Sequence, residues 1–237
     1  MLFAKAFLII FLGLCMPAYA KDMELSFSVH IKRMKVGTLE IHSQQSGKNY
    51  KVSGLLKTVG FMKLISNVEY KAETIGKITG ARFSPANYSE ERKEKGNKTS
   101  ASIAYKDETP EIRKYNPPRE KDPKRIDAST QKGTIDPLTA LYATLKDVNL
   151  KEMCKLELQL FDGKHKSRVK LSSFEKDGDL ILCYGEYVRL AGFRPEQMAE
   201  KTRFPFNIFY EEISKNTFRI KIVVAETIHG TAVLKAK

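Results

Sequence analysis

Residues 134–148 read Thr-Ile-Asp-Pro-Leu-Thr-Ala-Leu-Tyr-Ala-Thr-Leu-Lys-Asp-Val, and they decide the fold because they form the only strong amphipathic helix that the sequence predicts. Apolar residues at i, i+3, i+4, i+7 and i+10 would share one helical face: Leu138, Leu141, Tyr142, Leu145 and Val148. Asp136 can cap the first turn, and Pro137 suits the first helical position, where a missing N–H costs nothing. We therefore predict a helix over residues 136–148.

Strand patterns occupy the chain on both sides of this helix. Over residues 24–32, apolar and polar residues alternate strictly, which is typical of a half-buried strand. The alternation returns in many later segments, and Asp162-Gly163 is the strongest two-residue hairpin signal. We therefore predict a mainly β fold, in which a curved antiparallel sheet, or half-barrel, wraps around one central helix.

The first twenty residues have the features of a signal peptide. Lys5 precedes an apolar run over residues 6–16, and Ala18-Tyr19-Ala20 is a small-x-small cleavage pattern. The run is too short to span a bilayer, which needs about 20 apolar residues. We expect cleavage after Ala20, which would leave residues 21–237 as a single β-rich domain. The mature chain is expected to be periplasmic and soluble, with peripheral attachment to a membrane left open.

The expected export to an oxidising compartment bears on the cysteines. After cleavage only Cys154 and Cys183 would remain, so a disulfide is the default expectation. Zinc is less favoured because the four histidines lie far apart in the sequence, at positions 30, 42, 165 and 229. No metal site and no cofactor are predicted.

The chain is strongly basic. Its formal charge of +13 falls to +12 once Lys5 is removed. For an exported protein this charge does not indicate nucleic-acid binding, so the candidate counter-charges are anionic lipid head groups, lipopolysaccharide phosphates and cell-wall polymer. One strand would present a basic face, which consists of Lys164, Lys166, Arg168 and Lys170. The alternative is a solvated lysine-rich surface that keeps strand edges from pairing.

Two segments depart from the strand pattern. Residues 58–66 crowd apolar side chains without alternation and predict a short helix or apolar loop that includes Phe61, Met62, Leu64 and Ile65. This segment could plug the core, or it could line the mouth of an apolar binding groove. Residues 106–132 combine many charges with four prolines and predict a long charged loop, of the kind that is functional or disordered.

Catalytic motifs are absent from the sequence. It contains no Gly-x-Ser-x-Gly elbow, no His-Glu-x-x-His and no glycine-rich phosphate loop. We therefore predict no catalytic residues and no enzyme activity.

Several short motifs resemble those of an exported bacterial family, the domain of unknown function 3108 (DUF3108). They are Val36-Gly37, the Phe83, Pro85 and Tyr88 set, Ile135-Asp136-Pro137-Leu138, Phe161-Asp162-Gly163 and Cys183. The resemblance covers nearly all of the chain after residue 20. It implies a curved antiparallel sheet that resembles the half-barrel of outer-membrane lipoprotein carriers, with a helix in its concave face.

These observations lead to one functional hypothesis and one alternative. The hypothesis is a non-enzymatic envelope protein that binds a lipid or another apolar or acylated molecule in a groove between sheet and helix. The predicted ligand-binding residues are Phe61, Met62, Leu64, Ile65, Leu138, Leu141, Tyr142 and Leu145. The alternative is a structural protein with a packed interior, whose basic face docks on anionic envelope polymer or an envelope protein.

Overall fold

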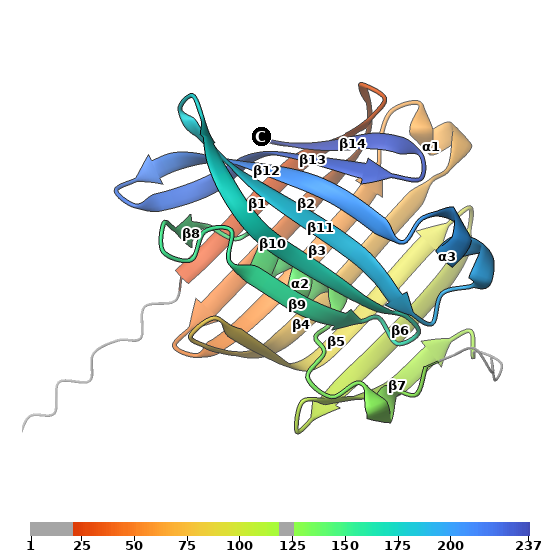
Figure 1. Ribbon diagram of the computed structural model, residues 1–237. Helices are drawn as coiled ribbons and strands as arrows, with labels where there is room; N and C mark the ends of the chain where they lie inside the picture. Colours follow the sequence, from red (N-terminus) through yellow and green to blue (C-terminus); the bar gives the residue numbers. More distant parts are fainter. Residues whose placement is uncertain (1–20, 119–125) are drawn as a thin grey trace, which may run out of the picture.

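The computed structural model describes residues 21–118 and 126–237, and it is built almost entirely from β-strands (Figure 1). The expected signal peptide and the middle of the predicted charged loop lie outside the described residues. Seven strands precede the main helix: β1 (Lys21–Ile31), β2 (Met34–Ser46), β3 (Asn49–Thr58), β4 (Val68–Thr79), β5 (Arg82–Glu94), β6 (Asn97–Lys106) and β7 (Thr109–Asn116). Seven follow it: β8 (Val148–Asn149), β9 (Leu156–Phe161), β10 (Lys166–Asp177), β11 (Leu180–Ala191), β12 (Arg203–Ser214), β13 (Thr217–Thr227) and β14 (Gly230–Ala236).

All of these strands belong to one antiparallel sheet. Its order is β7-β6-β5-β4-β3-β2-β1-β14-β13-β12-β11-β10-β9, with the short β8 paired to β13. The pairing of β1 with β14 joins the two halves of the chain, with Phe27 opposite Ala236 and Ile31 opposite Ala232. Inward residues of both halves, including Phe27, Ile41, Ile208 and Ile220, are almost completely buried in one core cluster.

The sheet curves further than the predicted half-barrel and is nearly closed. The segment just before the helix lies between its two edge strands, β7 and β9. The Gly133 N–H donates to the Glu108 carbonyl in the β6–β7 turn at 2.9 Å. Ile135 exchanges two bonds with β9, to the Gln159 carbonyl and from the Phe161 N–H, each at 2.9 Å. The mainly β architecture is thus confirmed, and the predicted half-barrel is corrected to a nearly closed barrel.

The main helix, α2 (Pro137–Leu145), begins at the predicted cap and is nine residues long. It ends earlier than predicted because Lys146 adopts an extended conformation, and Val148 enters β8 opposite Phe218. The helix makes its main contacts with β3, β4, β5 and β9. It therefore fills one part of the interior. The prediction of a sheet that wraps around one central helix is not confirmed.

The predicted loop over residues 106–132 is partly regular structure. Residues Thr109–Asn116 form β7, and a 3-10 helix, η1, covers Ala128–Thr130. Strand β7 is at the edge of the sheet, where Pro110 is tolerated because one side of an edge strand needs no partner for its N–H. The charges and prolines of this segment therefore predicted too little regular structure.

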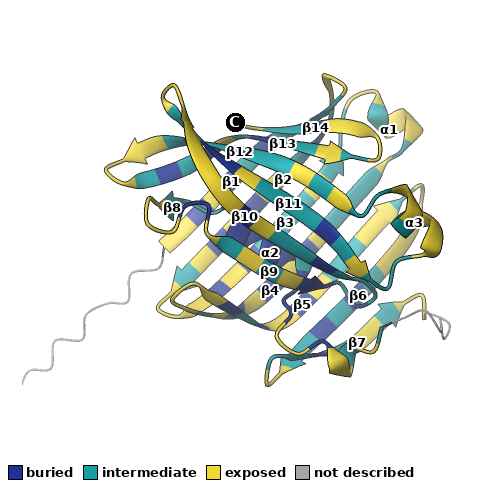
Figure 2. Cartoon of the chain, in the orientation of Figure 1, coloured by how far each residue is buried: buried dark blue, intermediate teal, exposed yellow. Residues whose placement is uncertain are grey.

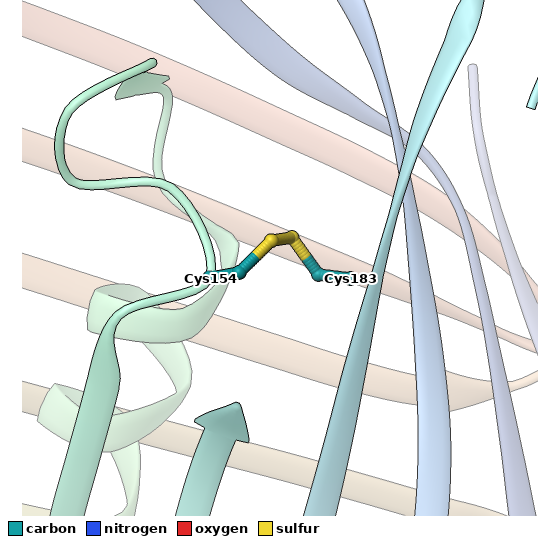
Figure 3. The surroundings of a disulfide bond; sticks show 2 residues. All are labelled: Cys154 and Cys183. Atoms are coloured by element: carbon teal, nitrogen blue, oxygen red, sulfur yellow. A yellow bond between two sulfur atoms is a disulfide. The ribbon is translucent and has the colours of Figure 1, made fainter. Parts of the chain in front are cut away.

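Cys154 and Cys183 form a disulfide bond, with Cα atoms 5.5 Å apart (Figure 3). Cys183 lies on β11, and Cys154 lies in the segment that connects β8 to β9. Both residues are buried in the core cluster. No helix within residues 21–118 and 126–237 is long and apolar enough to cross a membrane.

Candidate functional site

A cavity of about 300 Å³ lies where the C-terminal half of α2 approaches the sheet. Helix α2 contributes Ala143 and Thr144, and the surrounding strands contribute most of the apolar wall. That wall includes Phe83, Val148, Leu156, Leu171 and Tyr210, with Gly80 and Ala81 of the β4–β5 turn beside it. The predicted location between sheet and helix therefore contains a cavity.

The charged residues around this cavity are mostly basic. Lys146, Lys151 and Lys155 belong to its lining, together with one acidic residue, Glu152. Burial lowers the pKa of Lys146, and the nearby Glu152 carboxylate partly opposes that effect. An apolar wall with lysines at its border is suited to a ligand that combines an apolar chain with an anionic group.

The segment that carries these lysines is fixed at several points. The Asn149 side chain accepts hydrogen bonds from the N–H groups of Lys151 and Glu152, at 3.0 and 3.1 Å. Asp147 forms a two-pronged ion pair with Arg219 of β13, at 2.7 and 2.9 Å. The disulfide attaches the end of the segment to β11. One wall of the cavity is thus held by covalent, ionic and hydrogen bonds.

The start of α2 carries a buried carboxylate that the sequence predicted only as a helix cap. Asp136 is completely buried. Its carboxylate accepts hydrogen bonds from the Thr139 N–H at 2.8 Å, the Thr139 hydroxyl at 2.6 Å and the Thr74 hydroxyl at 3.0 Å. Tyr50 donates to the Thr139 hydroxyl oxygen at 2.8 Å, since Thr139 gives its single hydroxyl hydrogen to Asp136.

Burial raises the pKa of Asp136 to about 6, because the hydrogen bonds that favour the carboxylate offset the loss of hydration only in part. Burial is also the main cause of the raised pKa of Tyr50, to which the Asp136 charge adds. The four oxygen-bearing side chains of this network come from β3, β4 and α2 with its cap. This network fixes the helix to the sheet, and none of its carboxylate oxygens belongs to the cavity lining.

A second polar cluster, also absent from the sequence predictions, lies on β4 and β5. The hydroxyls of Tyr70 and Tyr88 are 2.8 Å apart, and both donate to the Glu90 carboxylate. Burial and the Glu90 charge raise the pKa of Tyr70. Alternation could have signalled this cluster, because Tyr88 and Glu90 are two residues apart on one strand and so share a face.

The structure divides the predicted ligand-binding residues into two groups. Leu138, Tyr142 and Leu145 are buried in the core, with Leu141 partly buried against it. The other group lies on a short helix, α1 (Met62–Ile65), which has no buried residue. Phe61 and Leu64 are 72% and 82% exposed. Figure 1 places α1 at one end of the barrel and away from α2, so residues 61–65 do not line the cavity.

The predicted basic face proves to be a mixed-charge surface. Arg168 is paired with Glu157 of β9 at 3.6 Å and with Glu186 of β11 at 4.0 Å. Lys170 is also paired with Glu157, at 3.3 Å. Lys166 begins the same strand, β10, and Lys164 precedes it. The carboxylates come from neighbouring strands, so inspection of this strand alone could not reveal them.

Metal ligands do not cluster in the part of the chain that the structure describes, where no group of three or more His, Cys, Asp or Glu could hold an ion. His165 has a different role. Its ring nitrogen lies 2.8 Å from the Asp162 carboxylate, and its ring stacks on Phe193 with centroids 4.3 Å apart. This pair stabilises the turn between β9 and β10.

The fold and cavity define a class: a nearly closed antiparallel barrel of β-strands with an internal helix and a small, mainly apolar cavity. The chain belongs to the family described as "Protein of unknown function (DUF3108)", whose model matches residues 26–180. The resemblance that the sequence motifs suggested is thus confirmed. The match includes α2, Cys154 and the first residue of β11, and Cys183 lies just beyond it.

A solved structure is also similar to this chain. It is a "Beta-barrel-like Protein of Domain of Unknown Function DUF1849 from Brucella abortus", 10% identical in sequence, with a TM-score of 0.49. The similarity covers 90% of this chain and 94% of that one. No curated protein matches the sequence.

Proposed function

We propose that this protein is exported to the periplasm and binds the apolar chain of an acylated or otherwise amphiphilic envelope molecule in the cavity beside α2. The observation that carries the proposal is the cavity itself: about 300 Å³, walled by apolar side chains and bordered by three lysines. Ligand pockets commonly enclose roughly 300–1,000 Å³. The volume therefore suits one short chain or the end of a longer one.

The residues for this role differ from those predicted. Ala143 of α2 and Phe83, Leu171 and Tyr210 of the sheet would contact the chain, in place of Phe61 and Leu64. Lys151 and Lys155 would interact with an anionic head group at the border. No catalytic step is part of the proposal, which treats the protein as a binding module.

Filling the cavity should abolish binding without unfolding the protein. Ala143→Leu adds apolar volume where the lining is open, so we expect an unchanged melting temperature and loss of uptake of a fluorescent fatty acid. Ala140→Leu is the matched control, because Ala140 is equally buried on the same helix but packs against Ile135 and Leu160. Overpacking there should cost about 1–3 kcal/mol of stability and leave uptake intact.

The measurement is a fluorescence titration of delipidated protein, accompanied by thermal unfolding of each variant. Wild-type protein should bind a fatty acid more tightly than the alcohol of equal length, because the lysines favour an anionic group. If Ala143→Leu binds the probe like wild type, or if no acyl ligand shifts the melting temperature, the interior is simply packed and the proposal fails.

Export has a separate test. The charged start, the apolar run and Ala18-Tyr19-Ala20 support cleavage after Ala20. The form that cells accumulate should therefore begin at Lys21 and be released with the periplasmic fraction. An N-terminus at Met1 in the accumulated protein would contradict this part of the proposal.

A further inference from the structure

One end of the barrel carries exposed apolar side chains on three neighbouring connections. We call this set the apolar rim: Met34, Phe61, Leu64, Ile65 and Ile228, all of them exposed large hydrophobic residues. Figure 2 colours most of the α1 connection as exposed. Side chains of this kind on a soluble domain are commonly scattered, so their collection at one end indicates an interaction surface.

The three connections are neighbours in the sheet. The Val59 N–H, just after β3, donates to the Val36 carbonyl of β2 at 3.0 Å, which places α1 beside the β1–β2 turn. The Lys32 side chain of that turn lies beside Gly230, the first residue of β14 after the β13–β14 turn. Figure 1 shows the three connections at the same end of the barrel, away from β8. The three connections that carry the rim are thus adjacent to one another.

The three connections that carry the rim have charges of one sign. Residues 31–37, 57–67 and 227–235 contain no Asp or Glu. Lys32, Arg33, Lys35 and Lys63 are exposed, and none of them has an ion pair within residues 21–118 and 126–237. Acidic side chains on the adjoining strands are already paired: Glu69 with Lys57 and Lys71, Glu94 with Arg92, and Glu226 with Lys201. The cations around the rim are therefore available to an external anion.

We infer that the apolar rim docks on the surface of an anionic lipid bilayer. Apolar side chains that enter the acyl boundary, with lysine and arginine beside them at head-group level, are the combination that holds interfacial segments on such membranes. The four unpaired cations complement the negative surface and select this partner over a neutral apolar one. The inference is independent of the proposed cavity, whose β4–β5 turn and β8 lie at the opposite end of the barrel.

Vesicle sedimentation tests the inference, with the full chain in the form that cells accumulate. Protein should bind phosphatidylcholine vesicles that contain phosphatidylglycerol and bind pure phosphatidylcholine vesicles much more weakly. Phe61→Ser/Leu64→Ser and Lys35→Gln/Lys63→Gln should each weaken binding to the anionic vesicles about tenfold or more. Raising the salt concentration should weaken wild-type binding and leave the lysine variant less affected.

Matched controls come from elsewhere on the barrel. Phe174→Ser removes an exposed aromatic from β10, and Lys48→Gln/Lys215→Gln removes two cations from turns at the opposite end. Neither should change binding, and all variants should keep the wild-type melting temperature because the altered side chains are exposed. Every variant keeps the wild-type N-terminus, so the comparison isolates the rim.

Three results would overturn the inference: no binding to anionic vesicles at low salt, rim variants that bind like wild type, or controls that lose as much as rim variants. Sedimentation equilibrium without lipid provides a further check. A wild-type dimer that Phe61→Ser/Leu64→Ser converts to a monomer would identify the rim as a contact between two copies of this chain and would likewise overturn the inference.

Discussion

Replacing Asp136 by asparagine should remove a large pH-dependent contribution to the stability of this protein. The carboxyl is completely buried at the start of α2, and its pKa is raised by burial to about 6 from an ordinary value of 3.8. The folded protein therefore holds a proton on Asp136 at pH values where the unfolded chain has released it. Asparagine keeps a similar shape and an acceptor oxygen but cannot titrate.

The sign follows from linkage. Because the folded-state pKa is the higher one, the contribution is fully present below about pH 4 and is lost as pH rises through about 6. Its size is on the order of 3 kcal/mol, at about 1.4 kcal/mol for each pH unit between the two pKa values. The free energy of unfolding of wild type, relative to Asp136→Asn, should fall by that amount between pH 4 and pH 7.

Urea unfolding of both proteins across this pH range measures the difference and cancels the other titrating groups that the two proteins share. Asp127→Asn is the matched control, since Asp127 also caps a helix but its carboxylate is accessible to water and has a lowered pKa through its hydrogen bonds with Ser129. It should not reproduce the fall in stability. A stability difference between wild type and Asp136→Asn that stays constant with pH would show that Asp136 is ionised throughout.

Loss of the disulfide is the second large effect we expect. Cys154→Ala/Cys183→Ala removes a bond between two residues that are 29 positions apart in the sequence. Removal of such a bond typically costs about 2–5 kcal/mol of stability. Both cysteines are buried, so alanine also leaves a small void beside the core. The midpoint of urea unfolding should fall accordingly.

Reductant gives the internal control for this prediction. It should lower the unfolding midpoint of wild type toward that of the alanine variant and should leave the variant unchanged. Hydrogen exchange should accelerate first in residues 148–155, because the bond fixes that segment to β11. Equal stability of oxidised wild type and variant would mean that the other contacts of the segment, including Asp147 with Arg219, are sufficient to hold it.

Local pattern was enough to predict much of this fold. Period-two alternation identified strands such as β1, because one face of this strand is buried at Met23, Leu25 and Phe27. Helix α2 was predicted from its stripe and its cap, and both features depend only on neighbours in sequence. The disulfide was predicted from the number of cysteines and the expected compartment.

What the sequence could not supply depends on pairing between distant segments. The carboxylates that neutralise Arg168 and Lys170 come from β9 and β11. Only the pairing register of these strands could show that the predicted basic face is neutralised. Phe61 and Leu64 were predicted to approach α2, but a connection between strands lies at a barrel end, and sequence does not say which end faces the helix. The cavity depends on how α2 is placed relative to the strands that line it with Phe83, Leu171 and Tyr210, which no local pattern encodes.

The short contact made by Gly133 and Ile135 has a consequence for how the protein behaves at high concentration. Open sheets present bare backbone groups that can template pairing with other molecules and lead to aggregation. Here the exposed side of β9 is occupied at Gln159 and Phe161 by the chain's own Ile135. Ile135 immediately precedes Asp136, so docking of the helix and covering of the β9 edge occur together. Once the helix of one molecule has docked, another molecule cannot add a strand to β9 at these positions.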